Sequence, residues 1–168
     1  MEFLTVPFDK GFNREEFDCE KESLNIYFKK QISQDIKKKL AVCFLYLDDD
    51  EETIIGYYTL SNASIPNNNV PEGLRKKFPK SFDYIPVTLL GRLALDKNYK
   101  GKGYGSKILV DALKRSLKVA ESDLGSVAVI ADPLDDQAEK YYEHFGFIKL
   151  QSSGKMFLDM KAIKKLEL

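Results

Sequence analysis

Residues 85–105 read IPVTLLGRLALDKNYKGKGYG, an apolar run that leads into a turn with glycines at positions 101, 103 and 105. The run predicts a central β-strand over residues 85–95. Apolar side chains then recur at helical spacing over residues 106–122, so the glycine turn joins a strand to a helix. The next apolar segment, residues 126–131, is short and continuous, which is typical of a strand buried in a parallel pairing. This strand–turn–helix–strand unit predicts an α/β or α+β fold.

The remaining segments extend the central unit into a sheet domain. Further strands are expected over residues 3–8, 41–47, 53–61, 147–150 and 156–160. The second and third of these flank an acidic turn and predict an antiparallel hairpin. Helices are expected over residues 18–38 and 136–145, and the proline- and asparagine-rich residues 65–80 predict a long loop with room for one short helix. With 168 residues, the chain suits a single domain spanning residues 1–168.

Composition excludes several classes of protein. Hydrophobic residues make up 43% and charged residues 31% of the chain, which is typical of a soluble globular protein. No stretch approaches the ~20 apolar residues of a membrane span, and residues 1–4 lack the basic start of a signal peptide. We therefore expect a cytoplasmic protein without membrane contact. Two distant cysteines, Cys19 and Cys43, and a single histidine, His144, predict neither a metal site nor a disulfide framework.

The charge balance weakens the case for a nucleic-acid partner without excluding it. Lysine and arginine together number 26, as do aspartate and glutamate, so the formal net charge is zero. Phosphate binding usually leaves a basic surplus. Residues 37–39 and 75–77 form basic clusters and residues 48–52 an acidic one, and each is most simply explained as a solvated surface.

The glycine turn offers a site for phosphate. Glycine adopts backbone angles that other residues avoid and lets a ligand approach the main chain. The helix that follows presents free N–H groups and a partial positive charge at its start, and Lys100 and Lys102 add charge. A P-loop is excluded because Ser106-Lys107 follows Gly105 in the wrong order, and the G-x-G-x-G spacing differs from the dinucleotide fingerprint. Taken alone, the turn fits a tight strand–helix connection without a ligand equally well.

Three further stretches surround the turn: residues 90–96 (LGRLALD), 131–134 (ADPL) and 138–147 (AEKYYEHFGF). Together with the turn, they resemble the GNAT superfamily of N-acetyltransferases, and the resemblance extends over about residues 3–160. The family signature has arginine or glutamine, two residues, glycine, one residue, then glycine or alanine. This chain departs from it at Lys100, which keeps the charge of arginine but loses its planar set of donors.

The resemblance implies a fold and an acetyl donor. A mixed sheet of six or seven strands is expected, with a splay between two parallel central strands and with flanking helices. The implied donor is acetyl-CoA. Main-chain groups of Leu93, Ala94 and Leu95 would bind its pantetheine arm, and a backbone N–H near Leu93 would polarise the acetyl carbonyl. The pyrophosphate would bind the amides of Lys100, Gly101, Lys102, Gly103, Tyr104, Gly105 and Ser106.

The resemblance also implies direct transfer to a primary amine, with Tyr142 as the proton donor to the leaving thiolate. A thiol has a pKa near ~8.5 and a phenol near ~10, so this donation is close to balanced. Helical spacing alone favours a core tyrosine, because Tyr142 shares a stripe with Ala138 and Phe145. The neighbouring Tyr141 points roughly 100° away around the helix. We expect His144, nearly on the opposite face from Tyr142, to lie in solvent.

No general base is evident, which favours an acceptor amine of low pKa. An α-amine titrates near ~7.7–8.0 and a lysine amine near ~10.4. A narrower resemblance, carried by residues 17–28, 56–61 and 85–94, is to bacterial toxins that acetylate the α-amine of aminoacyl-tRNA. Those toxins are commonly dimers and are held inactive by an antitoxin with a ribbon-helix-helix domain. Arg92 and Arg75 would then contact the tRNA. Acetylation of another amine, and an inactive protein that only binds the cofactor, stay open as alternatives.

Overall fold

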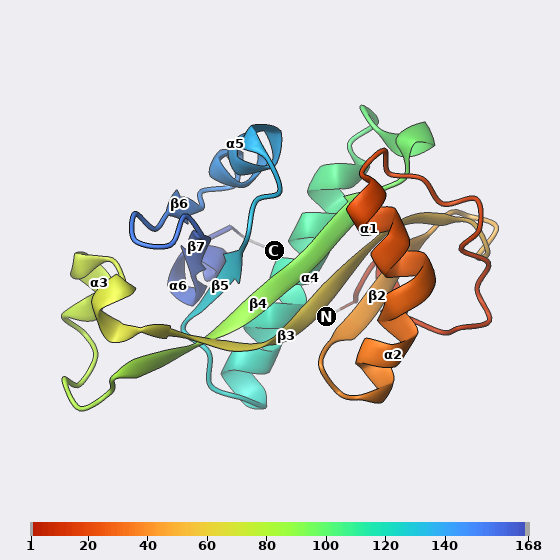
Figure 1. The fold of residues 1–168 in the computed structure, drawn as a ribbon. Helices are drawn as coiled ribbons and strands as arrows, with labels where there is room; N and C mark the ends of the chain where they lie inside the picture. The colour runs from red at the N-terminus through yellow and green to blue at the C-terminus, as the bar shows by residue number, and fades with distance from the viewer. Residues whose placement is uncertain (1, 167–168) are drawn as a thin grey trace. The chain divides into compact units, whose positions relative to one another are not determined.

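The computed structural model describes residues 2–166 (Figure 1). Its strands form a mixed seven-stranded sheet in the order β1-β2-β3-β4-β5-β7-β6. In chain order they are β1 (Thr5–Pro7), β2 (Val42–Leu47), β3 (Ile54–Pro66), β4 (Tyr84–Leu95), β5 (Ala128–Ala131), β6 (Ile148–Lys149) and β7 (Met156–Asp159). The pairing of β4 with β5 is parallel, whereas β1–β2, β2–β3, β5–β7 and β6–β7 are antiparallel. The predicted mixed sheet is confirmed, although β3 continues beyond the predicted end at residue 61.

The three long predicted helical segments are present. The helices are α1 (Glu22–Ile26), the π-helix η1 (Tyr27–Gln31), α2 (Ile32–Lys37), the 3-10 helix η2 (Asn67–Asn69), α3 (Glu72–Arg75), the 3-10 helix η3 (Lys97–Tyr99), α4 (Tyr104–Ser122), α5 (Asp136–His144) and α6 (Met160–Lys164). The structure adds η3 and α6, which the sequence did not predict, and places two short helices, η2 and α3, in the loop where one was expected. The unpredicted α6 begins where Asp159 ends β7, because the Asp159 carboxylate accepts a hydrogen bond from the Ala162 amide at 2.8 Å. Of the helices within residues 2–166, none is long and apolar enough to span a bilayer.

The chain divides into two compact units. The first comprises the residues up to Ser61 together with Gly91–Arg115, and the second comprises Asn62–Leu90 together with the residues from Ser116 onward. The glycine turn therefore belongs to the first unit and Tyr142 to the second.

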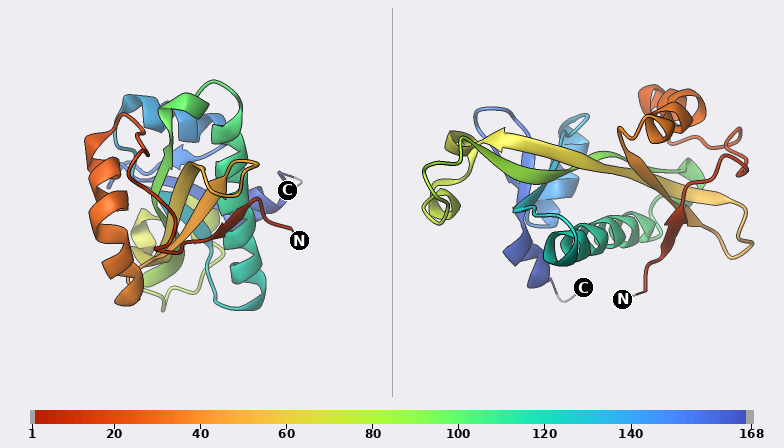
Figure 2. Two further views of the ribbon diagram at one scale, coloured as in Figure 1. Left: turned by 90° about the vertical axis from the view of Figure 1, so that its right-hand side faces the viewer. Right: turned by 90° about the horizontal axis from the view of Figure 1, so that it is seen from below.

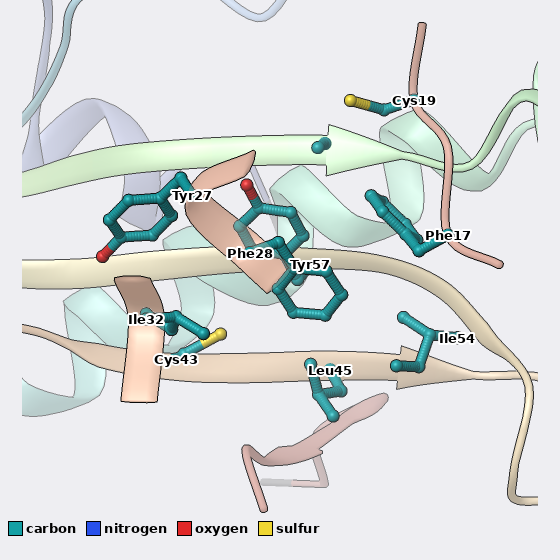
Figure 3. Close-up of a cluster of buried hydrophobic side chains, with 10 residues drawn as sticks. Phe17, Cys19, Tyr27, Phe28, Ile32, Cys43, Leu45, Ile54 and Tyr57 are labelled. Carbon is teal, nitrogen blue, oxygen red and sulfur yellow. The ribbon is translucent and has the colours of Figure 1, made fainter. Parts of the chain in front are cut away.

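In the first unit, the helical segment from α1 to α2 covers one face of β2 and β3 (Figure 2, right panel). Phe28 of η1 stacks on Tyr57 of β3 with the ring centroids 4.1 Å apart (Figure 3). Side chains of one parity along a strand share a face, so Cys43 and Leu45 of β2 join the same core. The cluster comprises Phe17, Cys19, Tyr27, Phe28, Ile32, Cys43, Leu45, Ile54, Tyr57 and Ala94. The predicted core position of Cys43 is confirmed.

Side chains of the opposite parity face the first part of α4. The guanidinium of Arg115 lies 3.8 Å from the ring centroid of Phe44 and 4.0 Å from that of Phe3. The Asp111 carboxylate, also on α4, is 1% exposed. It accepts hydrogen bonds from Thr5 of β1 and from Tyr58 of β3. A buried polar network therefore fixes β1 to α4 in this unit.

In the second unit, β4 pairs with β5 only over its early part. Thr88, Leu89 and Leu90 align with residues 129–131, and β5 ends at Ala131. Strand β4 continues to Leu95, and its residues from Gly91 onward belong to the first unit. The splay between the two parallel strands stays a prediction. The core of this unit comprises Ile65, Val70, Ile85, Val87, Ala128, Ile130, Leu150 and Phe157.

Candidate active site

The approach to the glycine turn is fixed by Asp96, which follows β4 directly. Its side chain is buried, and it accepts hydrogen bonds from the Asn98 amide at 2.9 Å and from the Asp18 amide at 3.0 Å. The first bond caps η3, the single turn that leads into the glycines. The Lys97 amide donates to the Asp18 carbonyl at 2.8 Å. Residues around Asp18 are thus attached to the start of the turn.

Asp18 itself is held in an ionised, hydrogen-bonded state. Its carboxylate accepts from the Glu20 amide at 2.8 Å and from the Asn25 side chain at 2.9 Å, and it pairs with Lys97 at 3.3 Å. These bonds, with the Glu20 amide first, lower the pKa of Asp18 to about 2. Glu20 also has a φ of 66°. Residues 18–21 therefore cannot join the helix, which explains why it begins at Glu22 rather than at the predicted residue 18.

The glycine turn has the geometry that its sequence predicts. Gly101 and Gly103 have φ values of 75° and 86°, in the left-handed region that other residues rarely adopt. A Cβ added at either position would meet no described atom within 4 Å. Glycine is therefore needed for its backbone angle and not to avoid a steric clash. Beyond the turn, the Lys107 amide donates to the Gly103 carbonyl at 3.4 Å. The amides of residues 101–104 and of Ser106 donate to no acceptor within residues 2–166.

Lys100 is committed to the protein rather than pointing freely from the turn. Its ammonium donates to the Cys19 carbonyl at 2.9 Å and pairs with Glu20 at 3.3 Å. Its amide makes a long hydrogen bond of 3.5 Å to the Lys97 carbonyl. As a consequence, Lys100 attaches the turn to the segment before α1, and the predicted contribution of its charge to phosphate binding stays a prediction.

Aromatic side chains border the turn. The Tyr104 ring lies edge-to-face with Tyr99 at 5.5 Å and with Tyr46 at 5.7 Å. The Lys102 ammonium lies 5.9 Å from the Tyr99 ring centroid, and its side chain is exposed. The Tyr99 hydroxyl donates to the Asp48 carboxylate in the acidic hairpin turn. These contacts attach the glycine turn to the β2–β3 hairpin.

The part of β4 that precedes the turn is fitted closely against β3. Ala94 is buried, and Leu93 and Leu95 are half-buried. A Cβ added to Gly56 of β3 would lie 2.7 Å from the Ala94 carbonyl oxygen, which is closer than real Cβ contacts allow. Glycine at position 56 is therefore required for this approach of the two strands.

Tyr142 lies on α5 in the second unit. The Asp135 side chain caps α5 by accepting from the Ala138 amide at 2.8 Å, and Gly146 ends it with a φ of 94°. The Tyr142 ring packs against Phe147 with centroids 5.2 Å apart, and the residue is 7% exposed. Within residues 2–166 its hydroxyl makes no hydrogen bond. His144 is exposed, as predicted.

Burial raises the pKa of the Tyr142 hydroxyl above its ordinary value, and the Asp132 carboxylate raises it further. The phenol is therefore protonated throughout the neutral range, which is the state that a proton donor needs. The same shift makes proton transfer to an ordinary thiolate less favourable than the near balance that the sequence suggested. The difference arises because the reference values describe groups in water.

Comparison with known proteins identifies the family. The model of the acetyltransferase (GNAT) domain matches residues 40–149. The chain belongs to the GNAT acetyltransferase family. A relative from Mycobacterium tuberculosis named tRNA-acetylating toxin is 33% identical over 131 residues, which cover 78% of this chain and 75% of the relative. A probable toxin TacT from Sinorhizobium fredii is 28% identical over 162 residues, 92% of this chain and 88% of the relative.

Solved structures show the same GNAT fold. A tyrosine-to-phenylalanine variant of the protein KacT superposes with a TM-score of 0.85 at 26% identity, over 92% of each chain. The protein AtaT complexed with acetyl-methionyl-tRNAfMet superposes with a TM-score of 0.88 at 24% identity, over 99% of this chain and 100% of that chain. These likenesses bear out the predicted fold.

The two arginines that were predicted to contact the acceptor substrate lie in different units. Arg92 of β4 places its guanidinium carbon 3.8 Å from the ring centroid of Tyr27 in η1. Arg75, the last residue of α3, makes a long hydrogen bond of 3.4 Å to the Asn68 carbonyl. Their predicted contact with tRNA stays a prediction. Asp96 belongs to the stretch that carries the family resemblance, but its capping role was not predicted, although an aspartate directly between a strand and a turn is a recognisable capping signal.

Proposed function

We propose that this GNAT enzyme transfers an acetyl group from acetyl-CoA to the α-amino group of an aminoacyl-tRNA. The main support for this proposal is a relative named for acetylating tRNA, which is 33% identical over 78% of this chain. The AtaT neighbour, which at 24% identity shares the fold, was solved with an acetylated methionyl-tRNA. Both observations favour the toxin-like alternative over acetylation of an unrelated amine.

The residues of the glycine turn suit the donor. Acetyl-CoA supplies an acetyl group as a thioester and carries a pyrophosphate. The amides of residues 101–104 and of Ser106 are without acceptors in the described chain, so they can bind the pyrophosphate oxygens at the start of α4. Leu93, Ala94 and Leu95 provide main-chain groups for the pantetheine arm. Tyr142, protonated at neutral pH, donates a proton to the departing sulfur.

The chemistry of the acceptor agrees with this assignment. At pH 7 roughly a tenth of an α-amine is neutral, whereas well under a thousandth of a lysine amine is. An enzyme that relies on a proton donor such as Tyr142, without a strong base, therefore works best on an α-amine. Arg92 and Arg75 are the cations proposed to meet the tRNA phosphates.

A structural neighbour also favours an antitoxin as a partner of this chain. AtaT has been solved bound to the C-terminus of the antitoxin AtaR. We infer that this chain is a single catalytic domain of the cytoplasm, where charged tRNA is found. We also infer that it forms a homodimer and is neutralised by an antitoxin with a ribbon-helix-helix domain.

Mass spectrometry of the reaction products tests the proposal. The purified protein is incubated with acetyl-CoA and a mixture of aminoacyl-tRNAs, peptides, polyamines and small amines. We expect the acetyl group on the α-amine of the aminoacyl-tRNAs. A low amine pKa favours α-amines over lysine amines and polyamines, and the relative named for acetylating tRNA favours aminoacyl-tRNA over peptides. Uncharged tRNA is the matched control and should stay unmodified. Acetylation of peptides or polyamines with charged tRNA untouched would contradict the proposal and leave the GNAT assignment standing.

A further inference from the structure

A buried threonine makes an unusual contact with β4. Thr59 of β3 is 1% exposed, and its hydroxyl accepts a hydrogen bond from the Arg92 amide at 2.9 Å. A strand amide ordinarily donates to a main-chain carbonyl of its neighbour. Here the acceptor is a side chain, which satisfies the Arg92 amide in place of a carbonyl. The contact therefore fixes the path of β4 at Arg92.

Glycine on the opposite strand makes room for this contact. A Cβ added to Gly91 would lie 2.9 Å from the Thr59 hydroxyl oxygen, closer than real Cβ atoms come. On the other side of Leu93, the Ala94 carbonyl oxygen would lie 2.7 Å from a Cβ at Gly56. Strand β3 thus contacts β4 on both sides of Leu93. The Thr59 hydroxyl binds the Arg92 amide on one side, and Gly56 packs closely against Ala94 on the other.

The direction of the Leu93 amide follows from the direction of its neighbour. Successive amides of a β-strand point to opposite edges. Because the Arg92 amide points to β3, the Leu93 amide points to the edge of β4 that faces away from β3. A shift of β4 at Arg92 would change where the Leu93 amide points, and the hydrogen bond to the Thr59 hydroxyl opposes such a shift.

We propose that Thr59 is a positioning residue for acetyl transfer, because its hydroxyl holds β4 so that the Leu93 amide is aimed at the acetyl carbonyl of the donor. The inference rests on the proposed function in one respect, namely that the Leu93 amide polarises this carbonyl. Thr59 touches neither the donor nor the acceptor. It acts only through the main chain of β4.

Two substitutions separate the hydroxyl from the shape of the side chain. Thr59→Val keeps the branched shape and removes the acceptor, whereas Thr59→Ser keeps the acceptor. Loss of one preorganised donor costs about 100- to 1000-fold in kcat, so misaiming it should cost about tenfold or more. We expect this loss in kcat for Thr59→Val with an unchanged KM for acetyl-CoA, since the glycine turn is untouched, and near wild-type kcat for Thr59→Ser.

Thr88→Val is the matched control. Thr88 also lies in β4, and its hydroxyl shares a 2.8 Å hydrogen bond with Ser126. The substitution removes a comparable bond from the same strand at a distance from Leu93. We expect its kcat to stay at the wild-type value. An equal loss in Thr88→Val or in Thr59→Ser would overturn the proposal, as would a loss that appears only in KM.

Infrared spectroscopy measures the polarisation of the acetyl carbonyl directly, without any acetyl transfer. The carbonyl stretch of bound acetyl-CoA, labelled with 13C at the acetyl carbonyl, falls in frequency when an N–H polarises it. We expect the same low frequency in the wild type and in Thr59→Ser, and a higher one in Thr59→Val. Equal frequencies in all three would refute the role of Thr59. Because the spectrum needs no acceptor, failure to acetylate aminoacyl-tRNA would count against the proposed function alone.

Discussion

Replacing Tyr142 with phenylalanine is expected to lower kcat for acetyl transfer by about 100-fold or more, the usual contribution of a positioned acid. The substitution removes only the hydroxyl, which is the group that would protonate the leaving thiolate. The ring packing on Phe147, with centroids 5.2 Å apart, is retained. The KM for acetyl-CoA should therefore change little. Steady-state kinetics with acetyl-CoA and an aminoacyl-tRNA measure both quantities.

Tyr141→Phe is the matched control for this experiment. Tyr141 is the adjacent residue on α5, its ring lies 5.3 Å from that of Tyr142, and burial raises the pKa of its hydroxyl as well. We expect Tyr141→Phe to keep most of the wild-type kcat. Thermal unfolding should show that both variants are folded. Full turnover in Tyr142→Phe would assign Tyr142 to the core, as its helical stripe alone would suggest.

Replacing Asp111 with alanine is expected to reduce the free energy of unfolding by about 3–5 kcal/mol, the usual result of removing one partner of a buried ion pair. The carboxylate is 1% exposed and lies 3.5 Å from the Arg115 guanidinium. It also accepts from the Leu4 amide at 2.6 Å and from the Tyr58 hydroxyl at 2.7 Å. The variant would remove the acceptor of the Leu4 amide and the counter-charge of Arg115, whose guanidinium would keep its bonds to Thr5. For a chain of this length, Tm should fall by roughly 10 °C.

Two variants sharpen this stability measurement. Asp111→Asn keeps an acceptor oxygen and should lose less stability than Asp111→Ala. Asp123→Ala removes an exposed aspartate just after α4 and should change the free energy of unfolding by less than about 0.5 kcal/mol. Denaturant unfolding followed by circular dichroism measures all three. If Asp111→Ala unfolded at the same denaturant concentration as Asp123→Ala, the buried network would not stabilise the chain.

The elements that could be predicted from the sequence are those specified by local patterns. Leu24, Phe28, Ile32 and Ile36 recur every four residues and indicated the helical segment, and all four lie in or against one core. The glycines of the turn indicated left-handed backbone angles, which Gly101 and Gly103 adopt. Such features depend on residues close together in the chain, so propensity and periodicity reveal them.

The features that escaped prediction depend on contacts between distant segments. The widening of the helix at η1, where the Ile32 amide donates to the Tyr27 carbonyl, has no local signal. The Lys100 ammonium binds the carbonyl of Cys19, 81 positions away, a contact that no local pattern indicated. The bond from Arg92 to Thr59 spans 33 positions. A single sequence does not show which side chains meet across such separations.

Main-chain amides of the glycine turn are proposed to bind the pyrophosphate of acetyl-CoA. Selective 15N labelling of glycine tests it directly, because the chain has only 10 glycines and an amide resonance shifts when a charged acceptor binds it. We predict that the Gly101 and Gly103 resonances shift on titration with coenzyme A but not with pantetheine, which lacks the pyrophosphate. Gly73 and Gly125, outside the turn, should not respond. Binding of coenzyme A that leaves the Gly101 and Gly103 resonances unshifted would contradict this binding mode.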